Sequence, residues 1–232
     1  MKKNNDVLII AAHPDDEVLG CGGAMVKHIE NGDDVHVIIL AEGMTSRDTN
    51  RNREGRSSDL STLAETAKKA NDIIGVTSLH LHDFPDNRMD SLDLLDVVKV
   101  IEGFIETYQP SIVYTHHRGD VNIDHTVIHD AVIAATRPQP GHCVKTVLFF
   151  ETASSTEWRP AQSLSAFSPN WFVDISGRAL SKKLEALEAY TTEMRAFPHA
   201  RSVKALDYLA KWRGSIIGCD AAEGFMLGRQ IK

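Results

Sequence analysis

The sequence has few cysteines and no long apolar run. Three cysteines occur among 232 residues, at Cys21, Cys143 and Cys219, and none forms a Cys-x-x-Cys pair. Such a sparse, odd-numbered set is typical of reduced thiols in a cytoplasmic protein. No stretch reaches the roughly 18 apolar residues of a transmembrane helix, so we expect no membrane span. The start, MKKNND, precedes only six apolar residues before His13-Pro14, which indicates a first β-strand rather than a signal peptide.

The sequence has fewer basic than acidic residues. The chain has 25 Lys and Arg against 32 Asp and Glu, a net charge of −7. Nucleic acids and anionic membranes attract proteins through basic patches, so we expect neither as a partner. The apolar content of 42% and charged content of 25% are ordinary for a soluble globular protein. The length fits one α/β domain over residues 1–232. The oligomeric state stays open, with a homo-oligomer as one option.

The most informative stretch is residues 7–23, VLIIAAHPDDEVLGCGG. Its first six residues are apolar and predict a strand buried on both faces. Pro14 suits the first position of a helix, where its missing N–H is not needed. Asp15, Asp16 and Glu17 would then fill the first helical turn, where the helix dipole favours negative charge. We therefore expect this acidic cluster where a parallel strand ends and a helix begins, an edge at which α/β proteins bind ligands.

A well-capped helix start would explain part of this pattern, but one histidine and three carboxylates within five residues exceed what capping needs. His13 and Asp16 are three residues apart, so they can lie on one side of the first turn and hold one ion. Asp15 points elsewhere and is free to act on a bound water.

Apolar runs and helical patterns alternate along the rest of the chain. This alternation predicts a Rossmann-like α/β fold, a three-layer sandwich around a mostly parallel sheet. We expect strands at residues 7–12, 35–40, 76–82, 112–115, 146–150 and 172–175. We expect helices at residues 17–31, 60–74, 92–108, 181–197 and 203–214, and a Ser/Thr-rich loop at 152–168.

The segment 45–58 is polar and rich in arginine, with Arg47, Arg51, Arg53 and Arg56. It is too polar to be core. Two interpretations stay open: a mobile solvated loop, or a lid whose arginines contact an anionic group of a substrate.

The motif Ala12-His13-Pro14-Asp15-Asp16-Glu17 resembles the AHPDDE signature of the LmbE/PIG-L family of zinc-dependent N-deacetylases. The resemblance continues through residues 170–176 and 183–190 to the terminal 222–225, so it covers nearly the whole chain. It implies a zinc-dependent hydrolase, an N-deacetylase acting on an N-acetylated sugar of the GlcNAc type, with one Zn²⁺ per chain.

A catalytic zinc site has three protein ligands and one open position. His13 and Asp16 supply two, and the third must follow another strand. The best candidate region is residues 116–125, HHRGDVNIDH. The family has a motif here that ends in Asp-His, so the resemblance implies that His125 completes the site. The alternative for His125 is a simple helix cap.

The catalytic roles follow from this ligand set. Asp15 is the expected general base, because a carboxylate near the zinc-bound water can take its proton and return it to the leaving amine. Asp124 is expected to orient a ligand imidazole. Much of the family has a histidine where this chain has Asn122, which cannot deliver a proton. Either Asp15 therefore makes both proton transfers, or His116 or His117 substitutes.

Several polar residues are candidates for binding the substrate. Glu42 and Asp86 follow the second and third strands, where the family has pocket residues. Arg53 or Arg56 would replace an arginine that the family places before residue 75. His199 and Arg201, in the loop 198–202, could reach a phosphate or carboxylate.

Two alternatives to a sugar deacetylase are kept. One is a zinc hydrolase of a non-sugar amide or ester, because pocket walls and not the fold set the substrate. The other is a nucleotide-binding protein without catalysis, suggested by Gly20-Cys21-Gly22-Gly23. Its glycines do not follow the G-x-G-x-x-G pattern, and the acidic residues before them would repel a pyrophosphate.

Overall fold

A computed structural model of the protein describes residues 5–160 and 166–232. The described strands are β1 (Asp6–Ala11), β2 (Asp34–Ala41), β3 (Ser78–Phe84), β4 (Ile112–His116), β5 (Thr146–Phe150), β6 (Trp171–Asp174) and β7 (Ala222–Gln230). The α-helices are α1 (Asp16–Glu30), α2 (Ser57–Ile74), α3 (Leu94–Tyr108), α4 (Ile123–Ala135), α5 (Arg178–Ala189) and α6 (Val203–Ile217). Short 3-10 turns occur at Thr45–Arg47, Met89–Ser91 and Thr156–Trp158.

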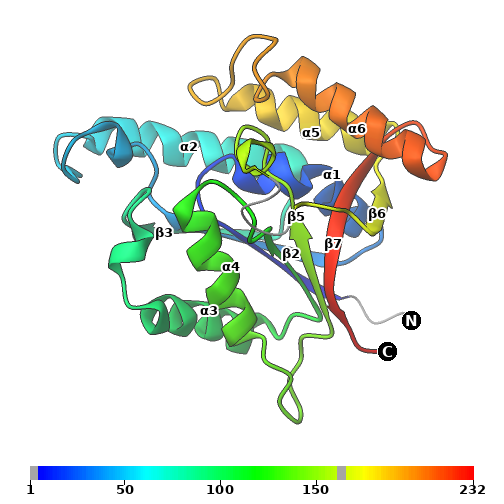
Figure 1. Ribbon diagram of the computed structural model, residues 1–232, viewed down its shortest axis with the longest axis horizontal. Coiled ribbons are helices and arrows are strands. Elements are labelled where there is room, and N and C mark those ends of the chain that lie inside the picture. Colours follow the sequence, from blue (N-terminus) through cyan, green and yellow to red (C-terminus); the bar gives the residue numbers. More distant parts are fainter. Residues whose placement is uncertain (1–4, 161–165) are drawn as a thin grey trace.

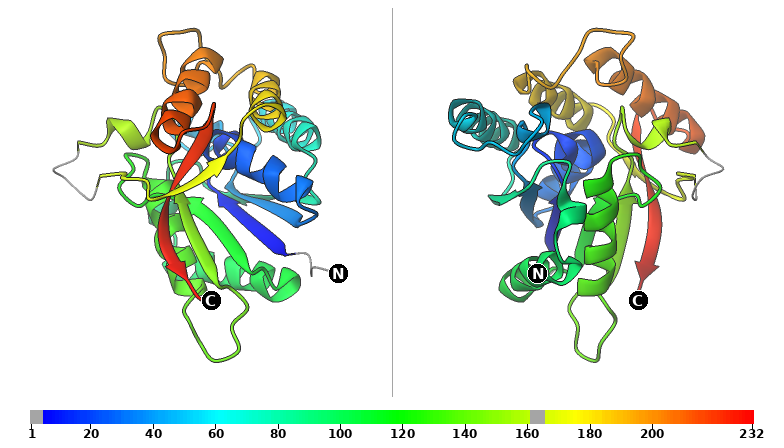
Figure 2. Two further views of the ribbon diagram at one scale, coloured as in Figure 1. Left: turned by 90° about the vertical axis from the view of Figure 1, so that its right-hand side faces the viewer. Right: turned by 60° about the vertical axis from the view of Figure 1, so that its left-hand side comes forward.

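The strands form one sheet in the order β3-β2-β1-β4-β5-β7-β6. The first five strands are parallel, and β7 runs antiparallel to both β5 and β6. Helices α3 and α4 cover one face, and α1, α2, α5 and α6 cover the other (Figures 1 and 2). The predicted three-layer sandwich with a mostly parallel sheet is therefore confirmed.

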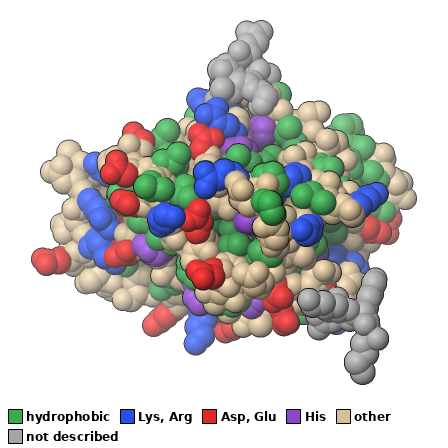
Figure 3. Space-filling model, turned by 90° about the horizontal axis from the view of Figure 1, so that it is seen from below, with side chains coloured by type: hydrophobic (Ala, Val, Ile, Leu, Met, Phe, Trp, Pro, Cys, Tyr) green, Lys and Arg blue, Asp and Glu red, His purple; other side chains and the backbone are tan. Residues whose placement is uncertain are grey.

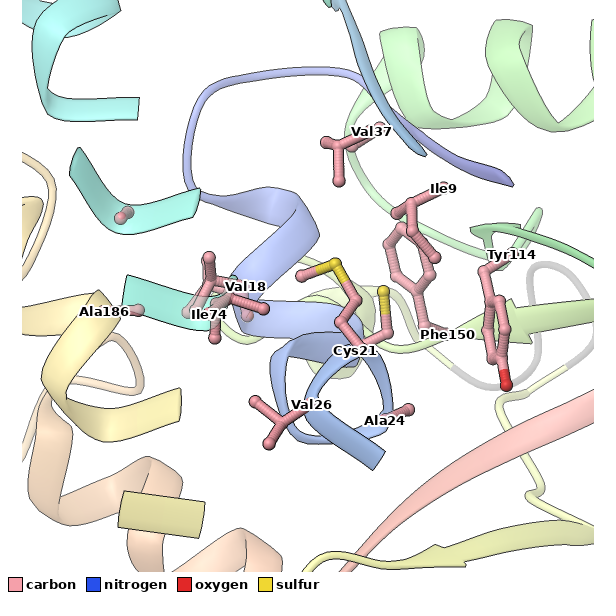
Figure 4. Close-up of a cluster of buried hydrophobic side chains, with 14 of the residues drawn as sticks. Ile9, Val18, Cys21, Ala24, Val26, Val37, Ile74, Tyr114, Phe150 and Ala186 are labelled. Carbon is pink, nitrogen blue, oxygen red and sulfur yellow. The ribbon is translucent and has the colours of Figure 1, made fainter. Parts of the chain in front are cut away.

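Strand β1 is buried on both faces, as its apolar run predicts. Val7 and Ile9 belong to the core beneath α1, α2 and α5, part of which is drawn in Figure 4. Leu8 and Ile10 belong to the opposite core, beneath α3 and α4. Because successive strand residues point to opposite faces, one short run serves both layers.

Several element bounds differ from the sequence predictions by a few residues, and two differences are larger. The helix expected at residues 181–197 starts at Arg178 and ends at Ala189. It ends there because Tyr190 leaves the helical conformation and sends its hydroxyl to Glu17, 2.7 Å away. The second difference is β7, which the sequence analysis did not identify as a strand. Part of the predicted 152–168 loop, residues 161–165, lies outside the described residues.

The glycines at the start of α1 lie inside a helix and serve close packing. A Cβ on Gly20 would lie 2.2 Å from the Phe150 ring, and one on Gly23 would lie 2.7 Å from Ile175. The helix is kinked at Cys21 (φ −145°, ψ 22°). The packing explains these glycines without a bound phosphate, so it gives no support to the nucleotide-binding alternative.

Three further findings concern the helices, the surface and the thiols. Within the described residues, no helix combines the length and apolar character needed to cross a bilayer. On the face shown in Figure 3, acidic and basic side chains are interspersed. Cys21, Cys143 and Cys219 are free thiols.

The strand order decides where a site can form. Chain order reverses between β1 and its neighbour β4: β2 and β3 lie on one side of β1, and β4 and β5 on the other. The loops that leave the carboxyl ends of β1 and β4 therefore diverge and leave a crevice between them. The segments with the predicted ligands, residues 12–16 and 116–125, leave the sheet at this crevice.

Candidate active site

The loop after β1 has an unusual backbone. Asp15 is the N-cap of α1 and has φ 119° and ψ −29°, a left-handed conformation that costs a non-glycine residue about 1–3 kcal/mol. The prediction that Asp15 lies in the first helical turn is wrong: only Asp16 and Glu17 lie there. The strained turn separates the side chain of Asp15 from that of Asp16.

Three predicted ligands meet at the crevice. His13 Nδ1 lies 3.2 Å from Asp16 Oδ2, and His125 Nε2 lies 3.1 Å from the same oxygen. One donor atom from each residue lies within 4.8 Å of the other two. Asp16 and His125 are fully buried, whereas His13 is partly exposed. Two imidazoles and one carboxylate, with one side toward solvent, are a donor set that could hold a divalent metal ion, and catalytic zinc sites use sets of this type.

Carboxylates hold the far side of each imidazole. His13 Nε2 lies 2.9 Å from Asp124 Oδ2 and 3.3 Å from Asp86 Oδ1. His125 Nδ1 lies 3.1 Å from Asp120 Oδ2, an ion-pair contact whose angles do not meet hydrogen-bond geometry. The carboxylates favour a proton on the ring nitrogens that they contact, His13 Nε2 and His125 Nδ1. From this polar network we infer that His13 Nδ1 and His125 Nε2 face the metal site.

His13, Asp86 and Asp124 form a second group with suitable donor spacing. It shares His13 with the first group and uses the opposite ring nitrogen. Asp124 already accepts hydrogen bonds from the backbone N–H groups of Asn87 (2.6 Å) and Met89 (2.9 Å). We therefore interpret this second group as the support of His13.

The electrostatics of the cluster favour a bound cation. Burial alone would lower the pKa of His125, but Asp16 and Asp120 raise it to about 9. Burial likewise opposes protonation of His13, yet Asp124, Asp16 and Asp86 raise its pKa well above the usual value. The surrounding carboxylates thus draw positive charge into a buried space, and a divalent cation can supply that charge as the protons leave.

Unpaired atoms support the same conclusion. Asp16 Oδ1 and Asp15 Oδ1 are buried and have no hydrogen-bond partner among the described residues. A buried carboxylate oxygen without a partner is costly, so such atoms indicate a missing ion or water. The residues present therefore fit a divalent metal ion.

Asp15 forms an ion pair with Arg201, whose Nη1 lies 2.7 Å from Asp15 Oδ2. Burial raises the pKa of Asp15 well above its usual range; Arg201 opposes this, and Asp16 adds to it. A raised pKa suits a carboxylate that must both take and return a proton.

A polar cavity of about 120 Å³ opens beside this pair. Of the predicted site residues, its walls include His13, Asp15, Asp86, Asn122 and Arg201. Its other walls are Pro14, Gly43, Met44, Ser46, Arg47, Leu63, Asn87 and Glu193.

Other predicted residues lie beside the cavity wall rather than in it. Glu42 is buried and accepts hydrogen bonds from Thr45 and Arg51. Arg53 pairs with Glu42 at 2.7 Å and with Asp83 at 2.6 Å. These contacts attach the 45–58 segment to the ends of β2 and β3.

Two further candidates are also engaged elsewhere. Arg56 pairs with Asp48 and Asp59. His199 accepts a hydrogen bond from the Arg201 backbone N–H and lies edge-on to Trp158. Neither lines the cavity, although Arg201, two residues after His199, does.

The candidates to replace the family's histidine are buried. His116 Nε2 accepts a hydrogen bond from the backbone N–H of Ala12, and its ring stacks on His125 with centroids 3.8 Å apart. Burial lowers the pKa of His116 well below its usual value, so the ring is neutral. His117 is buried and edge-on to Phe167. Neither histidine is a cavity wall in the described part of the chain.

Sequence reasoning missed several supporting residues. Glu17 Oε1 accepts hydrogen bonds from Asn71 and Tyr190, and its Oε2 accepts one from Asp15. Asp120 was also not singled out. Its position five residues before His125 has no helical or strand periodicity, so no sequence signal could have identified it.

Comparison with known proteins agrees with the motif. The PIG-L family, described as GlcNAc-PI de-N-acetylase, matches residues 8–136. The uncharacterized deacetylase YaiS of Escherichia coli is 28% identical over 194 residues, covering 81% of this chain and 91% of YaiS. The diacetylchitobiose deacetylase of Thermococcus kodakarensis is 26% identical over 238 residues, covering 94% and 81%.

Solved structures share the fold. The N,N'-diacetylchitobiose deacetylase of Pyrococcus horikoshii has a TM-score of 0.76 at 19% identity, covering 98% of this chain and 85% of that one. GalB, a 4-carboxy-2-hydroxymuconate hydratase of Pseudomonas putida, has a TM-score of 0.74 at 20% identity, covering 98% of each chain. Proteins of different activity thus share this architecture, and membership is decided by the family match over more than half of the chain. The chain belongs to the PIG-L family of de-N-acetylases.

Proposed function

We propose that this protein is a zinc-dependent hydrolase that removes the N-acetyl group from an N-acetylated sugar or sugar conjugate. His13, Asp16 and His125 would hold one zinc ion per chain. The donor set, the unpaired oxygens of Asp15 and Asp16, and the family's de-N-acetylase activity support this assignment.

One observation carries the proposal. Asp15 places a buried carboxylate oxygen, Oδ1, with no hydrogen-bond partner among the described residues, beside the three-ligand cluster. Its other oxygen is held by Arg201. A base fixed at one oxygen and free at the other is poised to accept a proton from a water in the cavity.

A zinc ion bound to the three ligands would lower the pKa of a water and polarise the amide carbonyl. The chain's own residues make the proton transfers. Asp15 takes a proton at Oδ1 as the water attacks and returns it to the nitrogen as the amine leaves. Asp120 and Asp124 hold the two imidazoles in the orientation that ligation needs.

The cavity walls favour a hydroxyl-rich substrate. Asp86, Asn87 and Asn122 present carboxylate and amide groups, and Ser46 adds a hydroxyl. Such groups hydrogen-bond sugar hydroxyls in both directions. The Thermococcus and Pyrococcus relatives are diacetylchitobiose deacetylases, which also supports a sugar.

The proposal has three further parts. The chain acts as a single domain over residues 1–232, as its one continuous sheet suggests. It works in the cytoplasm, where its free thiols stay reduced. Asp86 and Asn122 contact the substrate from the cavity wall, and Arg53 or Arg56 acts from the segment beside it.

The first experiment separates metal binding from catalysis. The metal content of the purified chain is measured after dialysis, and we expect about one zinc per chain. Asp16→Ala and His125→Ala should lose the metal. Asp15→Asn should keep it and lose about 10²–10⁴-fold in kcat, the usual contribution of a general base. Asp96→Asn, at an exposed position of α3, is the matched control and should behave as wild type.

The second experiment identifies the reaction. Released acetate is measured with N-acetylglucosamine, diacetylchitobiose, an N-acetylated amino acid and an acetate ester. Turnover of the two sugars alone supports the proposal. Turnover of only the amino acid or the ester would instead support the alternative that the protein hydrolyses a non-sugar amide or ester. Full activity of Asp15→Asn would disprove the assignment of the base.

A further inference from the structure

Hydrolysis of an amide places negative charge on the carbonyl oxygen, and a positioned donor beside the metal stabilises that charge. Asn122 is less suited to this task than a cation, because its amide is neutral. Its Oδ1 caps α4 by accepting the backbone N–H of Asp124 at 2.9 Å, and its Nδ2 donates to Asn87 Oδ1 at 3.0 Å. Each end of the amide thus has one partner in the wall, and the remaining N–H and lone pair are free for the proposed contacts with substrate hydroxyls.

Among the described residues, Arg47 and Arg201 are the two arginines that line the cavity. The guanidinium of Arg47 pairs with Glu193 at 2.9 Å, and its side chain is 43% exposed. The Arg201 side chain is only 21% exposed and lies against the catalytic carboxylates. A donor with little access to water is worth more to a developing charge.

The guanidinium of Arg201 is fixed on two sides. Nη1 donates to Asp15 Oδ2 at 2.7 Å, and Nε donates to Ser154 Oγ at 2.7 Å. The third nitrogen, Nη2, lies 3.9 Å from Asp16 Oδ1, which is too long for a hydrogen bond. Nη2 is therefore a rigidly held donor between the general base and a ligand carboxylate.

We propose that Arg201 is a catalytic residue whose Nη2 donates a hydrogen bond to the substrate's carbonyl oxygen as that oxygen becomes negative. Nη1 meanwhile holds Asp15 so that Oδ1 faces the attacking water. This inference rests on the proposed deacetylase function and assigns to Arg201 a role beyond binding an anionic group of the substrate.

The step balances as follows. The water oxygen bonds to the carbonyl carbon, the π electron pair moves onto the carbonyl oxygen, and one water proton passes to Asp15 Oδ1. When the carbonyl re-forms, the C–N bond breaks and Asp15 returns that proton to the nitrogen. The products are the free amine and acetic acid, which loses its proton to solvent. Arg201 stays charged throughout, because an arginine does not release its proton in proteins.

The test uses Arg201→Ala with guanidinium rescue. We expect kcat to fall by about 10²–10³-fold, the usual effect of removing one oxyanion donor, with KM changed less than about threefold and zinc content unchanged. Guanidinium chloride at sub-denaturing concentration should restore kcat at least about tenfold. Urea, which has the same shape without the charge, should not. Arg213→Ala is the matched control and should keep kcat, because this arginine is also paired with a carboxylate (Glu151) and only 15% exposed but does not line the cavity.

A binding measurement provides a readout besides turnover. The methylphosphonamidate of glucosamine has a tetrahedral, anionic centre in place of the amide. Its affinity should fall in Arg201→Ala by about the same factor as kcat/KM, whereas glucosamine itself should bind as to wild type. Arg201→Lys serves if the alanine variant does not fold. One ammonium cannot hold both Asp15 and the substrate oxygen, so kcat should still fall more than about tenfold.

The outcomes are separable. If wild type releases no acetate from any acetylated substrate, the proposed function fails and this inference fails with it. If wild type is active and Arg201→Ala raises KM at unchanged kcat, Arg201 only binds substrate and this inference alone is overturned. Rescue by urea as well as guanidinium would also overturn it, because the charge would then be unnecessary.

Discussion

Glu17 accepts a hydrogen bond from the backbone N–H of Asp15, with Oε2 and N 3.0 Å apart. The bond holds Asp15 in its left-handed conformation from within the same turn. Glu17 is itself fixed, because its Oε1 accepts the amide of Asn71 at 2.9 Å and the hydroxyl of Tyr190 at 2.7 Å. Asn71 in α2 and Tyr190 at the end of α5 thus contribute to the placement of Asp15, the proposed general base.

Glu17→Gln should therefore impair catalysis without removing the metal. Glu17 accepts three hydrogen bonds, so the NH₂ group of a glutamine would face another donor at one or more of them. Such a donor–donor contact should lower the free energy of unfolding by about 1–3 kcal/mol. We expect lower kcat, unchanged zinc content and reduced stability in urea. Tyr190→Phe removes a single donor and should keep most of the activity. Equal kcat in Glu17→Gln and wild type would refute the link between Glu17 and Asp15.

Asp120 supports His125 from behind and should tune the metal affinity. Burial alone would raise the pKa of Asp120, but His125 and the hydrogen bond from Ser155 lower it to about 2, so the carboxylate stays charged. Asp120→Asn should weaken zinc binding about 10–100-fold, as loss of such a partner generally does. Competition with a chelator measures this affinity. Asp130→Asn, whose partner Arg118 is exposed, should bind zinc as wild type does.

Lys183 and Glu223 form a buried pair beside the kink in α1. Lys183 Nζ lies 2.5 Å from Glu223, whose oxygens also accept the backbone N–H groups of Gly23 and Ala24. Lys183→Met leaves that carboxylate buried and should cost about 3–5 kcal/mol of unfolding free energy. Lys99→Met breaks an exposed pair and should cost less than about 1 kcal/mol. Similar losses in the two variants would contradict the role given to burial.

His129 should make stability depend on pH. Burial lowers its pKa in the folded protein, although the bond to the His116 carbonyl opposes this. The unfolded chain therefore takes up a proton first as pH falls below about 6.5, so stability falls through this range and levels off below the folded pKa. His129→Asn does not titrate and keeps a donor, so its unfolding free energy should fall less between pH 7.5 and 5.5. The unfolding free energies are measured with urea at both pH values. An equal fall in wild type and His129→Asn would contradict the prediction.

Most helices and strands were predictable because their signals are local. The apolar run at 7–12 and the alternation that follows predict the parallel sheet. Strand β7 was missed because it is antiparallel and its stability comes from pairing with β5 and β6. The end of α5 was missed because a contact with Glu17, far away in the sequence, ends it.

The sequence by itself determined the chemistry available: an imidazole and two carboxylates at the end of the first strand, and a second imidazole after the fourth. His13, Asp15 and Asp16 belong to one short motif, and His125 follows a predicted strand. Local patterns are therefore enough to find them. Only the tertiary structure decided which distant groups act on them. Asn71, Tyr190 and Arg201 reach the loop of Asp15 through helix packing, and no local pattern encodes those contacts. The same holds for Asp120, which the turn after β4 places behind His125.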